Sequence, residues 1–154
     1  KKKLNHNNNL LIYYRNKTLT LALNRASVAS IMERNMDRLQ RIIPHAAARA
    51  ALADKPHWIL VDDDDGPAFI VRAEDLANHL DSLEDDTAEI DLASFAATRK
   101  DVTGVLLQAT LQEALDILDK SGVEALYVTR ISAPMIDSVA GIVTREDIEA
   151  YYQS

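Results

Sequence analysis

The stretch Gly141-Ile142-Val143-Thr144-Arg145-Glu146-Asp147-Ile148 places a glycine and two aliphatic residues directly before a Thr-x-x-Asp pattern. Apolar residues that end at such a pattern are typical of a strand that turns into a helix. Threonine and aspartate at this spacing form a capping box, in which each side chain accepts a hydrogen bond from a backbone N–H of the first helical turn. The sequence therefore predicts a strand over 139–143 and a helix that runs towards Tyr152.

Outward from this stretch, the same order of elements occurs twice along the chain. The second half is predicted to contain a strand over 105–107, a helix that begins at a second capping box, Thr110 to Glu113, and strands over 125–131 and 139–143. The first half has matching segments, which are an extended segment over 36–43, an Ala-rich helix over 46–53, strands over 57–61 and 68–72, and a helix that opens at Glu74.

The spacing of equivalent positions confirms that this is an internal repeat. Val61 and Val128 are equivalent strand ends 67 residues apart, and Asp75 and Asp147 are equivalent helix starts 72 residues apart. A period of about 70 residues marks two copies of one strand–helix–strand–strand–helix unit. Neither copy is large enough to bury a sufficient core by itself, so we expect an α/β (α+β) fold in which the two units pack through their sheets.

Composition restricts the function. The 154 residues are 47% hydrophobic and 27% charged, as in a globular protein, and the net charge of −7 disfavours binding to nucleic acid. Cysteine is absent, which excludes disulfides, thiolate metal sites and cysteine nucleophiles. We find no catalytic constellation and no apolar run near the roughly 20 residues that span a bilayer. Because the sequence begins with Lys1, we expect it to be part of a longer protein.

The motif, the repeat and the order of elements together resemble the CBS domain, whose signature is a glycine, two apolar residues, a threonine, two variable residues and an aspartate. The resemblance covers residues 27–152 and includes Val28-Ala29-Ser30-Ile31-Met32. It implies a tandem CBS pair (a Bateman module) with pseudo-two-fold symmetry, which binds adenine nucleotides in clefts between the repeats. The expected units are a connector over 1–26, a first repeat over 27–86, a linker over 87–101 and a second repeat over 102–154.

Four residues are candidates for ligand binding in the second repeat. Gly141 lets a ligand or a neighbouring strand approach the backbone, and the Thr144 hydroxyl can donate to a phosphate oxygen. The Asp147 carboxylate can accept both hydroxyls of a ribose, and Tyr127 can stack on an adenine. The alternatives on the residues alone are a purely structural capping box for Thr144 and Asp147 and a core position for Tyr127. The expected ligand is ATP, ADP or AMP, and no metal or resident cofactor is expected.

The first repeat departs from this pattern. Alignment on Asp75 places Phe69 where Gly141 stands and Arg72 where Thr144 stands. Phe69 would crowd a ligand, and Arg72 cannot accept a hydrogen bond, although it can clamp a phosphate or pair with an acid. We therefore expect one nucleotide per chain, bound in the second cleft.

The flanking stretches Tyr14–Thr18 and Asn24–Ser27 resemble the connector between the last membrane helix and the CBS pair of bacterial chloride channel (CLC) proteins. This resemblance implies a regulatory module of a membrane transport protein, itself soluble, at the cytoplasmic face of the inner (plasma) membrane, with the membrane domain of its own chain as a partner. The alternative is a structural module that binds nothing and joins two subunits of a transporter or an enzyme.

A homodimer is expected from the apolar faces of the helices. These faces include Leu76, Leu80 and Leu83 in the first repeat and Ile148 and Tyr152 in the second. A pair of this size has too few layers to cover every such face, and CBS pairs use these helices for two-fold association.

The acidic run Asp62 to Asp65 is interpreted as a solvated hairpin turn. If Gly66 held position 6 of an EF-hand loop, Val61 would stand at position 1 and Arg72 at position 12, and neither side chain is a calcium ligand. The four histidines show no spacing typical of a metal site.

Overall fold

The computed structural model describes residues 21–86, 88–130 and 138–153. The connector stretch Tyr14–Thr18 and the hairpin loop around Pro134 lie outside the described residues. The elements in chain order are η1 (Val28–Ser30), β1 (Met36–Gln40), β2 (Ile42–Pro44), α2 (His45–Ala53), β3 (Trp58–Asp63), β4 (Gly66–Arg72), α3 (Ala73–Ser82), β5 (Glu89–Asp91), β6 (Arg99–Leu106), α4 (Leu111–Ser121), β7 (Ala125–Thr129), β8 (Val139–Thr144) and α5 (Arg145–Gln153).

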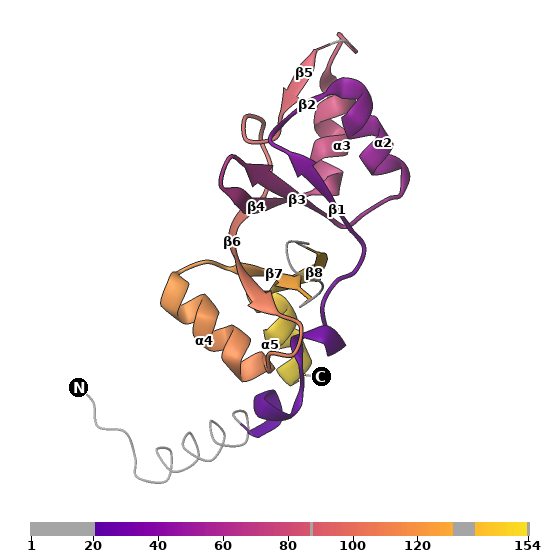
Figure 1. Ribbon diagram of the computed structural model, residues 1–154. Coiled ribbons are helices and arrows are strands. Elements are labelled where there is room, and N and C mark those ends of the chain that lie inside the picture. The colour runs from indigo at the N-terminus through magenta and orange to yellow at the C-terminus, as the bar shows by residue number, and fades with distance from the viewer. Residues whose placement is uncertain (1–20, 87, 131–137, 154) are drawn as a thin grey trace, which may run out of the picture.

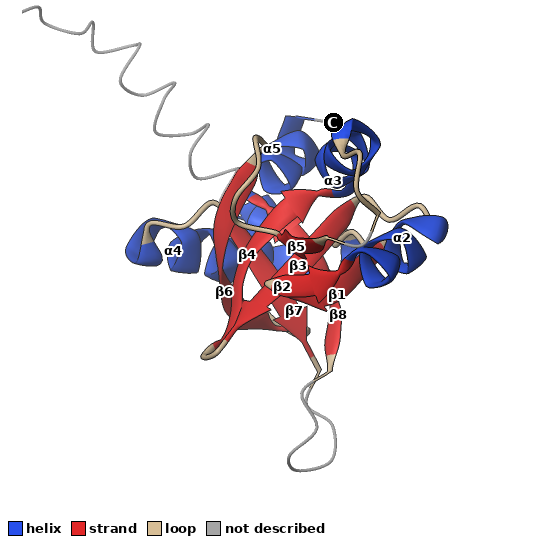
Figure 2. Ribbon diagram, turned by 90° about the horizontal axis from the view of Figure 1, so that it is seen from above, coloured by secondary structure: helices blue, strands red, loops and turns tan. Residues whose placement is uncertain are grey.

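Six strands form one sheet in the order β1-β3-β4-β6-β7-β8, and β2 pairs with β5 in a small second sheet. The elements from β1 to β5 form the upper half of Figure 1, and η1 and the later elements form the lower half. In each half a parallel pair, β1–β3 or β6–β7, precedes an antiparallel hairpin, β3–β4 or β7–β8. An antiparallel contact between β4 and β6 joins the halves, and the helices lie along the left, upper and right sides of the strands in Figure 2.

The strand registers confirm the internal repeat. Trp58 pairs with Arg72 as Ala125 pairs with Thr144, and Val61 pairs with Phe69 as Val128 pairs with Gly141. The register shifts immediately after Val61 in the first hairpin and immediately after Val128 in the second. The two hairpins are therefore equivalent residue by residue, and the alignment of Phe69 with Gly141 and of Arg72 with Thr144 is correct.

Alternation along the strands divides the core into three clusters. In β3, Ile59 and Val61 pack beneath α2 and α3, whereas Trp58 and Leu60 face the other half. Trp58, Leu60 and Ile70 of the first half share one buried cluster with Ala125 and Ile142 of the second. The halves thus bury the faces of their sheets against each other, as the small size of each repeat predicts.

The segment before β1 packs on the second half, although it precedes the first half in the chain. Val28 and Met32 are buried with the residues beneath α4 and α5. The N–H of Val28 donates to the Ala109 carbonyl (2.9 Å), and the backbones of Glu33 and Ile142 exchange hydrogen bonds of 2.7 and 3.0 Å. A contact between distant parts of the chain therefore holds this segment.

Residues 28–34 do not form the helix that the spacing of Val28, Ile31 and Met32 predicts, with Ser27 as its N-cap. The structure has a single 3₁₀ turn, η1, and the side chain of Ser27 makes no capping hydrogen bond. Backbone hydrogen bonds to the second half compete with a longer helix here, because the N–H of Glu33, which would donate to the Ala29 carbonyl in a helix, donates to the Ile142 carbonyl instead.

The second-half strand predicted over 105–107 is longer, because β6 begins at Arg99. The predicted linker over 87–101 also contains β5, whose Ile90 pairs with Ile43 of β2. The linker is therefore partly built into the two sheets.

The helix faces that argued for a dimer are buried inside the chain itself. Leu76 and Leu80 are 0% and 1% exposed under the first half, and Ile148 is 2% exposed under the second. Leu83 and Tyr152 are half-buried. The premise that these faces require a second subunit is wrong, since each half covers its own helices. Within the described residues, no helix has the length and the hydropathy of a membrane span.

Candidate functional site

The junction of β8 and α5 is the strand–helix turn that the motif predicts. The N–H of Asp147 donates to Oγ1 of Thr144 (3.1 Å), and the N–H of Thr144 donates to Oδ2 of Asp147 (2.9 Å). This reciprocal pair is a complete capping box. Thr144 is 3% exposed, whereas Asp147 is half-buried. The structural interpretation of these two residues is therefore confirmed, and any ligand contact would be additional to it.

Arg145 stands between the two capping residues in the sequence. Its side chain pairs with an acid of α4 and with another in the turn that follows α4. Its Nη2 lies 2.8 Å from Oδ1 of Asp119, and its Nε lies 3.2 Å from Oε2 of Glu124. These carboxylates raise the pKa of Arg145, with the hydrogen bond to Asp119 as the largest cause. The guanidinium thus ties the start of α5 to the end of α4, and both acids are exposed, so the pairs add little stability.

Gly141 is close to another part of the same chain. A Cβ atom at this position would lie 2.8 Å from the Glu33 carbonyl oxygen and 3.0 Å from Cγ and Sδ of Met32. The missing side chain therefore makes room for the segment before β1. The sequence left open whether a ligand or a neighbouring strand approaches this glycine, and here the neighbour is the chain itself.

Tyr127 lies on the opposite face of the sheet from Gly141. Its ring is half-buried among the residues between the halves, next to Ile142, its partner in the register. Val128, the partner of Gly141, belongs instead to the cluster beneath the helices. Of the four candidates, Thr144 and Asp147 touch each other, while Gly141 and Tyr127 face different ways.

The space for the Tyr127 ring is provided by Gly104, which the sequence analysis missed. Gly104 of β6 is paired with Tyr127, and a Cβ atom there would lie 2.9 Å from Cζ of the ring. A single glycine within an apolar strand pattern was the available signal, because such a glycine often marks a close approach.

The equivalent junction in the first half is occupied by other side chains of the chain. Arg72, at the position of Thr144, lies over the Trp58 ring with Cζ 5.3 Å from its centroid. Oδ2 of Asp75, at the position of Asp147, accepts a hydrogen bond from the N–H of Thr98 (2.8 Å). Arg99 lies over the rings of Phe69 and Phe95. Sequence reasoning missed Arg99 and Phe95, because neither belongs to the repeated motif.

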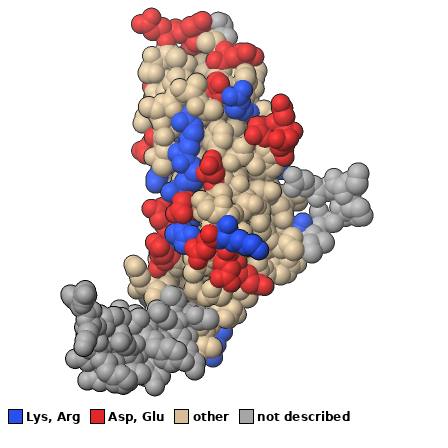
Figure 3. All heavy atoms as spheres, turned by 90° about the vertical axis from the view of Figure 1, so that its left-hand side faces the viewer, with Lys and Arg blue, Asp and Glu red and all other residues tan. Residues whose placement is uncertain are grey.

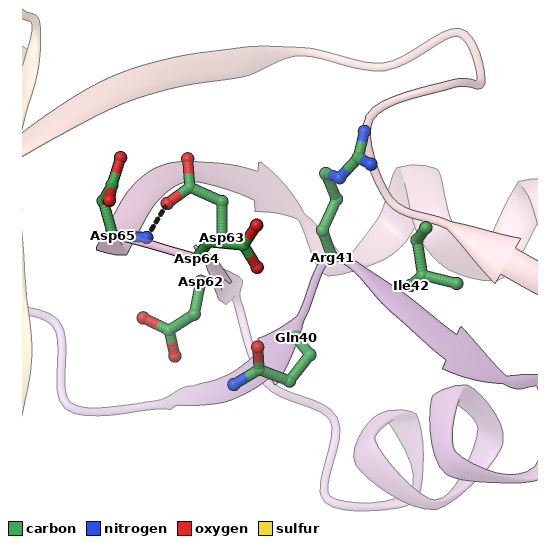
Figure 4. Close-up of a pocket in the computed structure, with 7 residues that line it drawn as sticks. All are labelled: Gln40, Arg41, Ile42, Asp62, Asp63, Asp64 and Asp65. Atoms are coloured by element: carbon green, nitrogen blue, oxygen red, sulfur yellow. Dashed lines mark hydrogen bonds between the residues drawn. The ribbon is translucent and has the colours of Figure 1, made fainter.

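A separate surface groove of about 610 Å³ lies beside the acidic hairpin (Figure 4). Asp62 is 6% exposed and pairs with Arg38, whose Nε and Nη2 lie 2.7 and 3.1 Å from its carboxylate oxygens. The N–H of Asp65 donates to Oδ1 of Asp63 (2.9 Å), and the Asp62 carboxylate points away from these two residues. In the described residues, no three acidic or histidine side chains are grouped to hold a metal ion.

The charged residues of the surface are mixed rather than separated. The face shown in Figure 3 carries acidic and basic side chains next to one another, as expected for a chain with 17 basic and 24 acidic residues. Charged residues of the described chain also form ion pairs, such as Arg41 with Asp91 (3.5 Å) and Lys100 with Glu146 (3.9 Å).

Neither protein-family models nor curated protein sequences give a match to this chain. Among solved structures, the CBS domain of a bacterial CNNM/CorC family Mg²⁺ transporter is similar, with a TM-score of 0.55, 17% identity and coverage of 97% of this chain and 96% of that chain. The same domain in complex with ATP matches with a TM-score of 0.55, 18% identity and coverage of 88% and 93%.

The CBS domain of a CBS-domain-containing membrane protein from Sphaerobacter thermophilus is also similar, with a TM-score of 0.55, 15% identity and coverage of 92% of this chain and 96% of that chain. None of these three neighbours is named as an enzyme. At such low identity the similarity is one of fold. The chain therefore has the mixed α+β fold of a CBS domain pair, with two equivalent halves on one curled sheet.

Proposed function

We propose that this chain is the regulatory CBS pair of a membrane transport protein and that it binds one adenine nucleotide at the β8–α5 junction. The observation that carries the proposal is that the second half alone keeps the Thr-x-x-Asp junction, on a fold shared with a transporter CBS domain in complex with ATP. Binding would regulate transport through different affinities for two arrangements of the pair.

The capping box and the ligand role are compatible. The Thr144 hydroxyl accepts one hydrogen bond from Asp147 and still has its own proton to donate to a phosphate oxygen. The Asp147 carboxylate accepts from the N–H of Thr144 through Oδ2, which leaves lone pairs on Oδ1 for a ribose hydroxyl. The positive end of α5 favours an anionic ligand at the same place.

For the host, we propose a chloride channel or transporter of the bacterial CLC type. The support is the connector-like sequence of Tyr14–Thr18 and Asn24–Ser27. The neighbours from Mg²⁺ transporters support a transporter host in general. In this host the pair lies at the cytoplasmic face of the membrane, is joined to the membrane domain of its own chain, and forms a homodimer.

Calorimetry with ATP, ADP, AMP and adenosine tests the binding site. We expect about one nucleotide per chain. Asp147→Ala should weaken binding by about 1.5–3 kcal/mol, the usual value for a hydrogen bond to a charged group, and Asp75→Ala should leave affinity nearly unchanged. Equal losses from the two variants, or two equal sites in the wild type, would contradict the proposal.

Thr144→Val separates binding from folding, because valine keeps the shape and lacks the hydroxyl. Thr110→Val is the matched control, since Thr110 forms the other complete capping box with Glu113. Each variant should lose about 0.5–2 kcal/mol of stability. Only Thr144→Val should also weaken nucleotide binding, and an equal loss of affinity in both variants would show that the effect is structural.

The second candidate function is a module that binds nothing and joins subunits. The specific observation in its favour is that Met32 and Glu33 fill the space at Gly141, while Arg99 covers Phe69 in the other half. The absence of heat with all four compounds at millimolar concentration, together with a dimer in light scattering, would favour this function over nucleotide sensing.

A further inference from the structure

The start of β6 lies against the hairpin of the first half, and the segment before β1 lies in the same way against the hairpin of the second half. Met36 pairs with Trp58 as Val102 pairs with Ala125, so β1 and β6 are equivalent strands. Glu33 pairs with Ile142 as Lys100 pairs with Ile70, so Glu33 is equivalent to Lys100, and Met32 is equivalent to Arg99. Both segments lie against the edge of the neighbouring hairpin, through β4 in the first half and through Ile142 in the second.

The two segments differ in the side chain that they place there. Met32, the equivalent of Arg99, lies against Gly141, with Cγ and Sδ 3.0 Å from where a Cβ atom of that glycine would lie. The Arg99 side chain instead extends over aromatic rings of its own half. Its Cζ lies 4.9 Å from the centroid of Phe95 and 5.9 Å from that of Phe69, both within the range of a cation–π interaction.

Several contacts hold the guanidinium of Arg99 in this position. Its Nε donates to the Leu92 carbonyl (3.0 Å), and its Nη2 is buried without a hydrogen-bond acceptor. Phe95 is 8% exposed and is itself stacked on His79, with ring centroids 4.3 Å apart and an angle of 7° between the planes. Arg99 therefore covers a fixed aromatic surface.

The carboxylate at this junction is also engaged by the same segment. Asp75 accepts from the N–H of Thr98, which lies 23 residues away and is adjacent to Arg99 in sequence. Asp147, by contrast, accepts from the N–H of Thr144 in its own capping box. A ligand that used the Asp75 carboxylate would therefore have to displace the N–H of Thr98, whereas one that used Asp147 would meet only a hydrogen bond within the turn.

We propose that Arg99 is an internal occupant of the first cleft and sets the binding asymmetry of the pair. The flat guanidinium covers the aromatic face that a planar base would need, and Thr98 holds the carboxylate that a ribose would need. This inference rests on the proposed function, because it assumes that an adenine nucleotide is the kind of ligand that the cleft would otherwise accept.

The test is the number of ATP or AMP molecules bound per chain, measured by calorimetry. Arg99→Ala should raise this number from about one to about two. Addition of Asp75→Ala should then remove the new site, and addition of Asp147→Ala should remove the original one. Arg41→Ala is the matched control, because it removes another arginine of the first half, paired with Asp91, and should leave the number unchanged.

The outcomes separate this inference from the proposed function. If the wild type binds nothing and Arg99→Ala binds one nucleotide in a way that requires Asp75, the internal occupant is supported and nucleotide sensing at β8–α5 fails. An unchanged number in folded Arg99→Ala overturns the inference.

A second variant covers the case in which Arg99→Ala does not fold. Arg99→Lys keeps the charge and most of the stem but lacks the planar group. The first cleft of this variant should therefore bind a second nucleotide, with lower affinity than in Arg99→Ala. An unchanged number in folded Arg99→Lys, with Arg99→Ala unfolded, also overturns the inference.

Discussion

Gly141 and Gly104 are both glycines within strands, but they make room for different kinds of atoms. At Gly141 the nearest atom is the carbonyl oxygen of Glu33, which accepts from the N–H of Ile142, while the N–H of Glu33 donates back to the Ile142 carbonyl. At Gly104 the nearest atoms belong to the outer end of the Tyr127 ring, which can rotate away. The tolerance of each position to a methyl group therefore depends on what must move.

We expect Gly141→Ala to lower the free energy of unfolding by about 1–3 kcal/mol, the usual cost of overpacking against a fixed neighbour. Gly104→Ala should cost less, since the ring can shift and alanine restricts the unfolded chain. Urea unfolding of the two variants beside the wild type measures the difference. An equal cost, or a greater cost at Gly104, would show that the segment around Glu33 yields easily.

The acidic hairpin between β3 and β4 is an element that we expect to be dispensable. Asp63 and Asp64 are exposed, and Asp65 donates its N–H to the side chain of Asp63. Asparagine at position 63 keeps an oxygen that can accept this bond. The variant with Asp63→Asn and Asp64→Asn should thus change stability by less than about 0.5 kcal/mol, with a slight gain if like-charge repulsion is relieved.

Thermal unfolding with and without calcium measures this prediction. Asp62→Asn is the control within the same run, because Asp62 is buried and holds the Arg38 guanidinium, so its loss should be clearly more costly. A melting temperature that rises by several degrees with calcium, and no longer does so in the double variant, would contradict the interpretation of a solvated turn.

At the scale of the whole molecule, the apolar helix faces are buried within one chain, so they are not available to a subunit interface. Leu80 is 1% exposed within a single chain, so Leu80→Ala should lower the free energy of unfolding by about 2–5 kcal/mol. The mass measured by light scattering on the folded variant should equal that of the wild type. A variant that keeps its stability but dissociates would instead place Leu80 in the subunit interface.

Light scattering from micromolar to millimolar concentration also tests the proposed homodimer itself. We expect a dimer whose interface uses side chains that the single chain leaves open. Among the described residues, Leu106 and Tyr151 are the exposed large hydrophobic side chains of the second half, at 48% and 38%. A monomer at every concentration would contradict the proposal for the isolated pair.

The sequence by itself determined the features that depend on neighbouring residues. The capping boxes at Thr110 and Thr144 are confirmed because both partners lie within one helical turn. Gly122, which follows Ser121, ends α4 in the left-handed conformation, with φ of 75°, as is usual for a glycine after a helix. The repeat was visible because each half carries the same local signals in the same order, so the fold class followed.

Only the tertiary structure decided what lies against these elements. The segment around Val28 packs on the second half, more than 70 residues further along the chain, and this contact limits its helix to one turn. Arg99 reaches Phe69 across 30 positions, and no local pattern marks the pair. The physical reason is that packing selects partners by position in space, whereas capping and alternation are set by spacing along the chain.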